Sequence, residues 1–414
     1  MTRAIVTGVT MIGAALAATP LAAQNAPPPL APPAMVAPPV STPPAEDPLA
    51  SFVIARGEVE SPKGRMPVQL LVKGDDAAVR GVVPGEMRWR YLPIGDPDTA
   101  LRLLADRRLA FLWEPLLAWT GPDLGLLRQR TIDKAERAYA MASPNAPTNS
   151  ADSTVRPPTR ALLQFANVLY RAGYSDRALK LVEDERAKRT LKANWDQMEW
   201  VILTIREGNL LIGLGRYDEA IRLLAEARER IGRENVFGVN IDVNRAAGLA
   251  NVGRYAEALA VITEARAQFD GGKERGKRGA EKLDGSDRQF EWIRGCALKG
   301  LGRADEARPA FATVLNAPEP ADPFFKTENN DQLRFRVYFC TRDSAALATY
   351  LKSDIDTSLI APGSFLLLQP AWRTTNDPGK LYDAVRADPG LRIAAARWMR
   401  ELPPALLPAL NYWR

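Results

Sequence analysis

One phrase is written almost twice in the middle of this chain, and no other feature constrains the fold as strongly. NLLIGLGRYDEAIRLLAEA occupies residues 209–227, and ANVGRYAEALAVITEA occupies residues 250–265. Looser copies precede and follow these two phrases. Repeats with a period of about 20–50 residues are typical of arrays in which each copy is one supersecondary unit. The chain therefore contains several copies of one small unit.

Four columns align the copies. Each copy has an alanine, a glycine five residues before it, a leucine nine residues before it and a small residue twelve residues before it. Because glycine makes up about 7% of ordinary sequence, four glycines in one chosen column have a chance probability of roughly 2 in 100,000. The columns are Ala178, Ala220, Ala258 and Ala307; Gly173, Gly215, Gly253 and Gly302; Leu169, Leu211, Leu249 and Leu298; and Ala166, Gly208, Ala246 and Gly295.

These columns are typical of an antiparallel pair of helices. A small residue on the first helix lets the second helix approach closely, and the leucine fills the seam between them. The glycine ends the first helix at a position that needs left-handed dihedral angles. Such a hairpin cannot cover its own apolar face, so neighbouring hairpins must stack to bury it. The sequence predicts a mainly α fold.

The units resemble tetratricopeptide repeats. GNLLIGLGRYDEAIRLLAEA and AGLANVGRYAEALAVITEA are similar to that family's spacing of small residue, leucine, Gly-x-Tyr and Glu-Ala, and GCALKGLGRADEARPAF has Ala304 in place of the tyrosine. The family's repeat is about 34 residues long, whereas the alanines here are 42, 38 and 49 residues apart. The resemblance implies an exported bacterial member of this family, with a right-handed α-solenoid over residues 160–315.

The remainder of the array departs from the pattern. The charged, Gly-rich stretch 270–287 accounts for the largest spacing, and we expect it to be a solvated loop. Residues 316–402 predict a degenerate fifth unit, with Ala346 at the helix crossing and no glycine at the turn, and then C-terminal capping helices. Residues 403–414 form a tail.

The N-terminus predicts export. MTRAIVTGVTMIGAALAATPLAAQ has one positive residue, an apolar run and small residues before Gln24, as in a cleaved signal peptide, which we expect over residues 1–23. A transmembrane anchor is the alternative, but it needs about 20 apolar residues, and Pro20 interrupts this run. Residues 24–48 are rich in proline and predict an extended linker. We expect a periplasmic, envelope-associated protein.

A lead-in region separates the linker from the repeats. PVQLLVKGDDAAVRGVVPG and MRWRYLPI contain short β-prone runs, whereas DTALRLLADRRLAFLWEPLLAWTG has helical periodicity. We expect a small α+β region over residues 49–142 whose helices pack onto the first repeat, followed by a linker loop over residues 143–159.

Composition excludes several classes of chemistry. The chain has no histidine, which removes imidazole bases, Ser-His and Cys-His pairs and imidazole metal ligands. Two cysteines cannot build a thiolate zinc site or an iron-sulfur cluster. The 55 basic and 49 acidic residues are spread evenly, without the basic patch typical of nucleic-acid binding. We expect no catalytic residue, no metal, no cofactor and no nucleic-acid partner.

The resemblance implies a concave groove that binds a protein or peptide and is lined by the first helices. Leu163 and Ile205 stand where the family's carboxylate-binding lysines would be, so that clamp is not implied. Asparagine amides in such a groove can donate to and accept from a peptide bond, although they could equally be no more than solvated. The groove residues carried over are Asn167, Tyr170, Arg171, Arg206, Asn209, Asn244, Asn251, Trp292 and Lys299.

The sequence leaves open whether Cys296 and Cys340 form a disulfide. An oxidising compartment favours the bond, but helix axes about 8–10 Å apart often hold cysteines too far from each other.

Three hypotheses for the function follow. The first is a non-catalytic periplasmic scaffold that binds a protein or peptide partner in a cell-envelope assembly. The second is a polysaccharide- or ligand-handling envelope component in which aromatic rings such as Trp292 stack on sugars. The third is an enzyme or binding module in residues 49–142 that uses the repeats as an adaptor. We expect no stable membrane span once the signal is removed.

Overall fold

The computed structural model describes residues 47, 49–86, 88–142, 156–189, 191, 194–232, 235, 237–274, 286–316, 328–372 and 381–406. The expected signal (1–23), most of the linker (24–48), residues 143–155 and the end of the tail lie outside these ranges. Within them the chain is mainly helical, with one small antiparallel sheet. No helix in the described ranges combines the length and apolar character needed to cross a membrane.

The lead-in begins with a four-stranded antiparallel sheet in the order β1-β2-β3-β4. Met66, Val68 and Leu70 alternate with exposed or half-exposed residues and are fully buried, as expected for a sheet that covers a core with one face. The first strand was not expected from the sequence. The strands are β1 (Val53–Ser61), β2 (Gly64–Lys73), β3 (Asp76–Val82) and β4 (Trp89–Pro93), and the helices that follow are α1 (Pro97–Ala105), α2 (Trp113–Thr120) and α3 (Gly125–Met141).

Four helical hairpins follow, and the aligned columns occupy the expected places in them. Each turn glycine has a positive φ, between 75° and 88°, which suits glycine because it has no Cβ. The hairpins are α4 (Pro157–Arg171) with α5 (Ser175–Ala187), α6 (Asn194–Gly213) with α7 (Tyr217–Ile231), α8 (Gly238–Asn251) with α9 (Tyr255–Glu274), and α10 (Ser286–Gly300) with α11 (Ala304–Leu315).

The small-residue column is explained by close packing within each hairpin. A Cβ atom added to Gly208 would lie 3.2 Å from the side chain of Leu224, and one added to Gly295 would lie 2.6 Å from the ring of Phe311. The second helix therefore approaches the first so closely that a larger residue in this column would force a shift. The leucine column is buried, with exposures of 0–4%.

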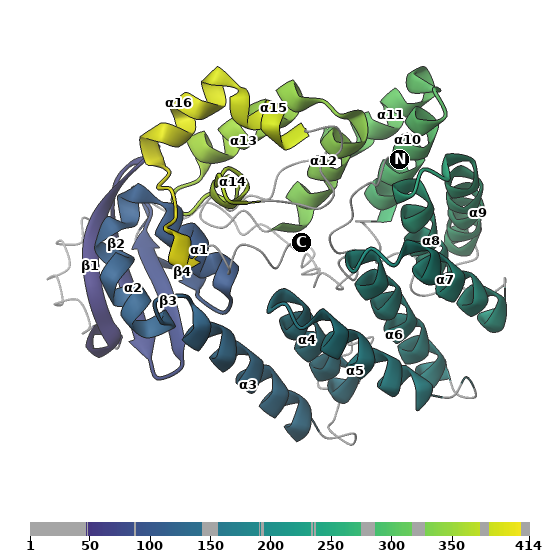
Figure 1. Cartoon of the computed structure of the whole chain (residues 1–414), viewed down its shortest axis with the longest axis horizontal. Coiled ribbons are helices and arrows are strands. Elements are labelled where there is room, and N and C mark those ends of the chain that lie inside the picture. The colour runs from purple at the N-terminus through teal and green to yellow at the C-terminus, as the bar shows by residue number, and fades with distance from the viewer. Residues whose placement is uncertain are drawn as a thin grey trace, which may run out of the picture.

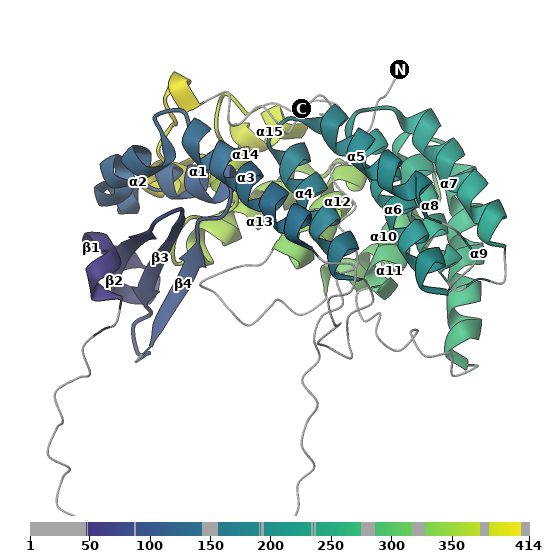
Figure 2. The same cartoon turned by 90° about the horizontal axis from the view of Figure 1, so that it is seen from below.

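The hairpins stack side by side into an arc (Figure 1). Helix α4 contacts α6, α6 contacts α8, and α8 contacts α10, so the first helices form a continuous inner layer. The second helices lie on the outer side of the arc in Figure 1. Figure 2 shows the same arc from the edge, with the sheet at the opposite end of the molecule from α7 and α9.

A fifth hairpin, formed by α12 (Glu328–Thr341) and α13 (Ser344–Thr357), has no glycine at its turn. Arg342 takes the left-handed conformation there, with φ of 54°. The residue five positions later is Leu347, which is fully buried, whereas Ala346 is half-buried and lies in the first turn capped by Asp343. The expectation that Ala346 lies at the crossing was wrong by one residue, because no glycine marked the register.

The two ends of the chain share one hydrophobic core. The lead-in packs against the C-terminal helices α14 (Ser364–Leu367), α15 (Leu381–Ala387) and α16 (Pro389–Trp398). Asp106 forms a β-bridge with Met399, and the backbone N–H of Arg400 donates to the carbonyl of Ala105. Because α3 also contacts α4, the elements follow one another around a ring that closes between the lead-in and the C-terminal helices (Figure 1).

Some expected boundaries differ from the observed ones. Helix α9 continues to Glu274, so residues 270–274 of the expected loop are helical. Helix α4 begins at Pro157, inside the expected linker 143–159, because proline suits the first turn of a helix. Leu406 of the tail is fully buried in the shared core.

Candidate partner-binding face

The groove residues expected from the sequence lie on the first helices, which line the inner side of the arc. Most of these residues are more buried than the side chains that line a solvent-filled groove. Five of them are at most 8% exposed, and we call these five the polar row. The polar row consists of Arg206 and Asn209 on α6, Asn244 and Asn251 on α8, and Trp292 on α10.

Asn244 and Asn251 have hydrogen-bonding capacity that the described part of the chain leaves unused. The Asn244 side-chain amide donates to the carbonyl of Asn240, one turn earlier, at 2.6 Å. Its Oδ1 atom accepts no hydrogen bond, and the Nδ2 atom of Asn251 donates none, within the described residues. A buried amide atom without a partner costs about 1–3 kcal/mol. These two atoms are therefore placed where a peptide bond could satisfy them.

Arg206 connects the first two hairpins. Its guanidinium donates to Oδ1 of Asn167 on α4 at 3.1 Å, and the side chain is only 8% exposed. The pKa of Arg206 is lowered to about 10, mainly by burial; Tyr170 opposes this shift and the charge of Arg171 adds to it. The guanidinium is thus still charged at neutral pH, in a place that disfavours charge.

Tyr170 is held by a glycine on the next hairpin. A Cβ atom at Gly213 would clash with the Tyr170 hydroxyl and ring, so a larger residue there would force the Tyr170 side chain to move. Burial raises the pKa of the Tyr170 phenol, and the charge of Arg206 opposes that shift. Tyr170 therefore remains a neutral donor beside Arg206.

Trp292 is covered by an arginine that sequence reasoning missed. The guanidinium carbon of Arg336, on α12, lies 4.6 Å from the centroid of the Trp292 ring, and the indole is 4% exposed. The indole N–H has no hydrogen-bond partner in the described ranges. Arg336 lies six residues before the turn residue Arg342, and Asn167 lies six residues before the turn glycine Gly173. Had the turn of the fifth hairpin been assigned correctly from the sequence, Arg336 would have been included among the groove residues. A sugar would need an exposed ring face, which Trp292 lacks.

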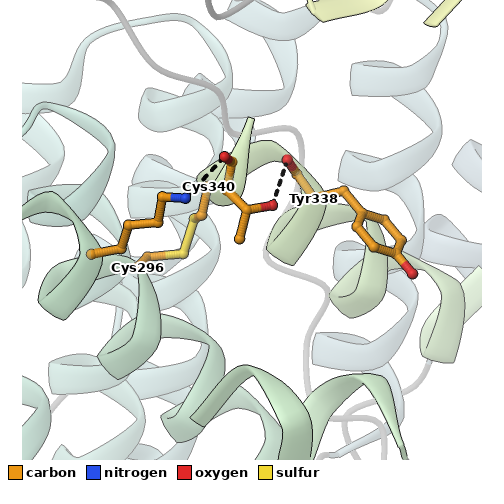
Figure 3. The surroundings of a disulfide bond; sticks show 5 residues. Cys296, Tyr338 and Cys340 are labelled. Atoms are coloured by element: carbon orange, nitrogen blue, oxygen red, sulfur yellow. Dashed lines mark hydrogen bonds between the residues drawn. A yellow bond between two sulfur atoms is a disulfide. The ribbon is translucent and has the colours of Figure 1, made fainter. Parts of the chain in front are cut away.

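Lys299 is exposed, unlike the polar row. Its Nζ atom donates to the backbone carbonyl of Thr341 at 3.0 Å, which ties the end of α10 to the end of α12 (Figure 3). Cys296 and Cys340 form a disulfide beside this contact, with their Cα atoms 5.5 Å apart. The close approach of α10 and α12 brings the two cysteines within reach.

The rest of the described surface offers less to a ligand. A cavity of about 340 Å³ lies between the β1-β2 hairpin and α16, but its charged residues, among them Glu60, Asp356 and Arg397, are all exposed. The described residues contain no group of three or more acidic or thiol side chains arranged to hold a metal ion. The lead-in thus presents no cluster of buried polar groups around this cavity.

No family model matches the chain, and no curated protein matches it in sequence. Among solved structures, a chain described as "MamA AMB-1 P212121" is 19% identical, covers 45% of this chain and 86% of its own length, and superposes with a TM-score of 0.28. A similarity this low supports no argument about fold or function. The functional conclusion therefore depends on the residues of this chain.

Proposed function

We propose that this protein is a non-catalytic, tetratricopeptide-like scaffold that binds a protein or peptide partner in a cell-envelope assembly. The supporting observation is the polar row. Its buried atoms with unused hydrogen-bonding capacity recur on consecutive first helices, at Arg206, Asn244, Asn251 and Trp292. Buried polar groups in native proteins nearly always have partners. An extended peptide crossing the first helices would supply a donor or acceptor to each in turn.

The proposed architecture is a right-handed solenoid of tetratricopeptide-like hairpins. The left-handed turn glycines and the tightly packed small-residue column support it, because both belong to a repeated hairpin that stacks on its neighbours. Extended inner surfaces of this kind suit a partner that lies across several repeats better than they suit chemistry at one point.

The proposed location is the periplasm. The leader-like residues 1–23 support export. The pairing of Cys296 with Cys340 supports an oxidising compartment, because structural disulfides are rare where thiols are kept reduced. Fusion of residues 1–48 to a reporter enzyme that is active only outside the cytoplasm tests this part. A cytoplasmic, uncleaved fusion would contradict it.

A pull-down with the full chain tests the binding function. We expect one stoichiometric protein partner, and we expect the double variant Asn244→Ala/Asn251→Ala to lose most of it, because the two amides that α8 contributes to the polar row are removed. Thr263→Ala is the matched control, since Thr263 is exposed on the outer helix α9 of the same hairpin. Capture that is equal for wild type and the double variant would show that the polar row does not bind the partner.

A further inference from the structure

The outward face of helix α16 combines positive charge with an exposed apolar side chain. The helix buries Leu391, Ala394 and Ala395 in the shared core, and the opposite side of the helix is exposed. No aspartate or glutamate occurs from Pro389 to Arg400. The exposed residues of the helix include Arg392, Ile393, Ala396 and Arg397.

Closure of the ring brings further arginines to this face. Arg107, which is exposed, donates from its guanidinium to the carbonyl of Ala396 at 3.1 Å. Arg400 follows α16 and is held by its backbone N–H, which donates to the carbonyl of Ala105. We call the resulting group the arginine face, and it consists of Arg107, Arg392, Arg397 and Arg400.

The arginine face lacks counter-charges in the part of the chain that the structure describes. None of its four guanidinium groups forms an ion pair there, whereas most arginines of the repeats have a carboxylate partner. Glu60 and Asp356 line the same cavity as Arg397 without pairing with it, and Asp356 pairs with Lys352 at 2.8 Å instead. Cations gathered in this way attract an anionic partner.

The neighbouring side chains favour a lipid surface over a nucleic acid as that partner. The guanidinium carbon of Arg397 lies 4.3 Å from the centroid of the Trp398 ring, and that of Arg400 lies 4.5 Å from the centroid of Trp113. Both rings already stack with guanidinium groups, so they are less available to nucleic-acid bases. Ile393, by comparison, is 74% exposed among the arginines. An apolar side chain flanked by cations suits the boundary between head groups and acyl chains.

We propose that the arginine face docks this protein on an anionic lipid surface, with Ile393 inserted below the level of the phosphates. Guanidinium groups suit lipid phosphates because two of their N–H groups can donate to one phosphate. Each arginine near such a surface strengthens binding roughly fivefold. Figure 1 shows α16 on the outer rim of the ring, whereas the first helices line its inner side. Lipid docking therefore uses a different surface from the polar row.

Flotation with lipid vesicles tests the docking. The chain from Gln24 onward contains every described residue and lacks the expected signal. We expect it to float with vesicles of equal parts phosphatidylglycerol and phosphatidylcholine, and not with phosphatidylcholine alone. The double variant Arg392→Gln/Arg397→Gln should bind at least about tenfold more weakly. Arg160→Gln/Arg222→Gln is the matched control, because it removes the same charge from two exposed positions of the repeats and should bind as wild type does.

Ile393→Ser separates lipid docking from binding of any polyanion. The position is exposed and the charge is unchanged, so the variant should fold as wild type does and bind anionic vesicles about fivefold more weakly or worse. Its binding to heparin should be unchanged. Vesicle binding by Ile393→Ser equal to that of wild type, or wild-type binding to heparin or single-stranded DNA as tight as to vesicles, would overturn the lipid surface as the partner.

Two further outcomes bear on the proposal. Equal flotation of wild type with neutral and anionic vesicles, or equal weakening by the arginine variant and its control, would overturn the role of the arginine face. The polar-row variant Asn244→Ala/Asn251→Ala should float as wild type does. Its loss of the protein partner with normal flotation would show that the two surfaces act separately, and loss of flotation in this variant would contradict the separate lipid surface.

Discussion

Individual residues in this protein show two ways of holding a buried charge. Arg228 donates to the Asp242 carboxylate, to the carbonyl of Gly232 and to the side chain of Gln268, each at 2.6 Å, so its charge is compensated within the hairpin stack. Arg206 has no such carboxylate in the described residues. The Asp242 carboxylate offsets the cost of desolvating Arg228, whereas Arg206 has only the neutral amide oxygen of Asn167 as an acceptor in the described residues.

The turn residue Arg342 provides a prediction at this scale. A non-glycine residue with φ of 54° is strained by its Cβ, and Arg342 is exposed. Arg342→Gly should therefore stabilise the protein by about 0.5–1 kcal/mol. Gly302→Ala, at the equivalent turn of the preceding hairpin, should destabilise it by about 1 kcal/mol. Urea unfolding of both variants measures the two effects, and a shift of the same sign in both would contradict this explanation of the turns.

Among the elements, three of the four second helices in the glycine-turn hairpins share one ion pair at their N-termini. In α7, α9 and α11 the arginine that follows the turn glycine pairs with the glutamate three residues later, at 2.7 Å in α7 and 2.6 Å in both α9 and α11. The pairs recur because the sequence repeats Gly-Arg-x-x-Glu, and they hold the first turn of each helix. The pairs are Arg216 with Glu219, Arg254 with Glu257, and Arg303 with Glu306.

These pairs predict a pH dependence of stability. The hydrogen bond from each arginine lowers the pKa of its glutamate below 4.5 in the folded state. A lowered pKa stabilises the fold above the unfolded value, and this contribution disappears as the pH falls through the lowered pKa. The triple Glu→Gln variant should therefore melt below wild type at pH 7, and the difference should shrink below about pH 4. A difference that is constant with pH would contradict the prediction. Glu226→Gln on α7 serves as the control.

The disulfide provides a second prediction for the elements. It joins α10 to α12 across 44 residues of sequence, and a loop of that length restricts the unfolded chain substantially. The variant Cys296→Ala/Cys340→Ala should lose about 4 kcal/mol of unfolding free energy on the chain-entropy account. Wild type unfolded under reducing conditions should show the same loss. Equal midpoints for oxidised and reduced wild type would mean that the bond does not stabilise the fold.

At the scale of the whole molecule, the decisive feature is the closure of the ring. Asp106 is 1% exposed, and its carboxylate accepts from the side chain of Arg108 and from the backbone N–H of Ala361, 255 residues away. Nearby, Gln369 donates to the carbonyl of Arg400 and accepts from the N–H of Leu402. These contacts fix one arrangement of the lead-in on the C-terminal helices.

Asp106→Ala should open this junction. It leaves the Arg108 guanidinium buried without its carboxylate, which costs about 3–5 kcal/mol. We expect a lower urea midpoint, together with faster proteolysis of both the sheet and α14–α16. Asp75→Ala is the control, because the side chain of Asp75, which pairs with Arg130, is 64% exposed. Proteolysis accelerated in the sheet alone would show that the two ends fold independently.

The sequence by itself determined the hairpins. Gly215 and Gly253 had to stand at turns because their neighbours repeat with helical spacing, and local rules of this kind need no knowledge of distant residues. It also placed the polar row on the first helices. The register of the fifth hairpin was missed, because Arg342 carries no glycine signal there.

Only the tertiary structure decided the closure of the ring, the pairing of Cys296 with Cys340 and the isolation of Arg206. Each depends on residues far apart in sequence, such as Asp106 with Ala361, whose proximity is set by the summed curvature of all the stacked hairpins. A sequence pattern reports which face of a helix is apolar. It does not report the rotation of each hairpin relative to the next. Those rotations together bring the last helices back to the lead-in and determine which charged side chains have no counter-charge.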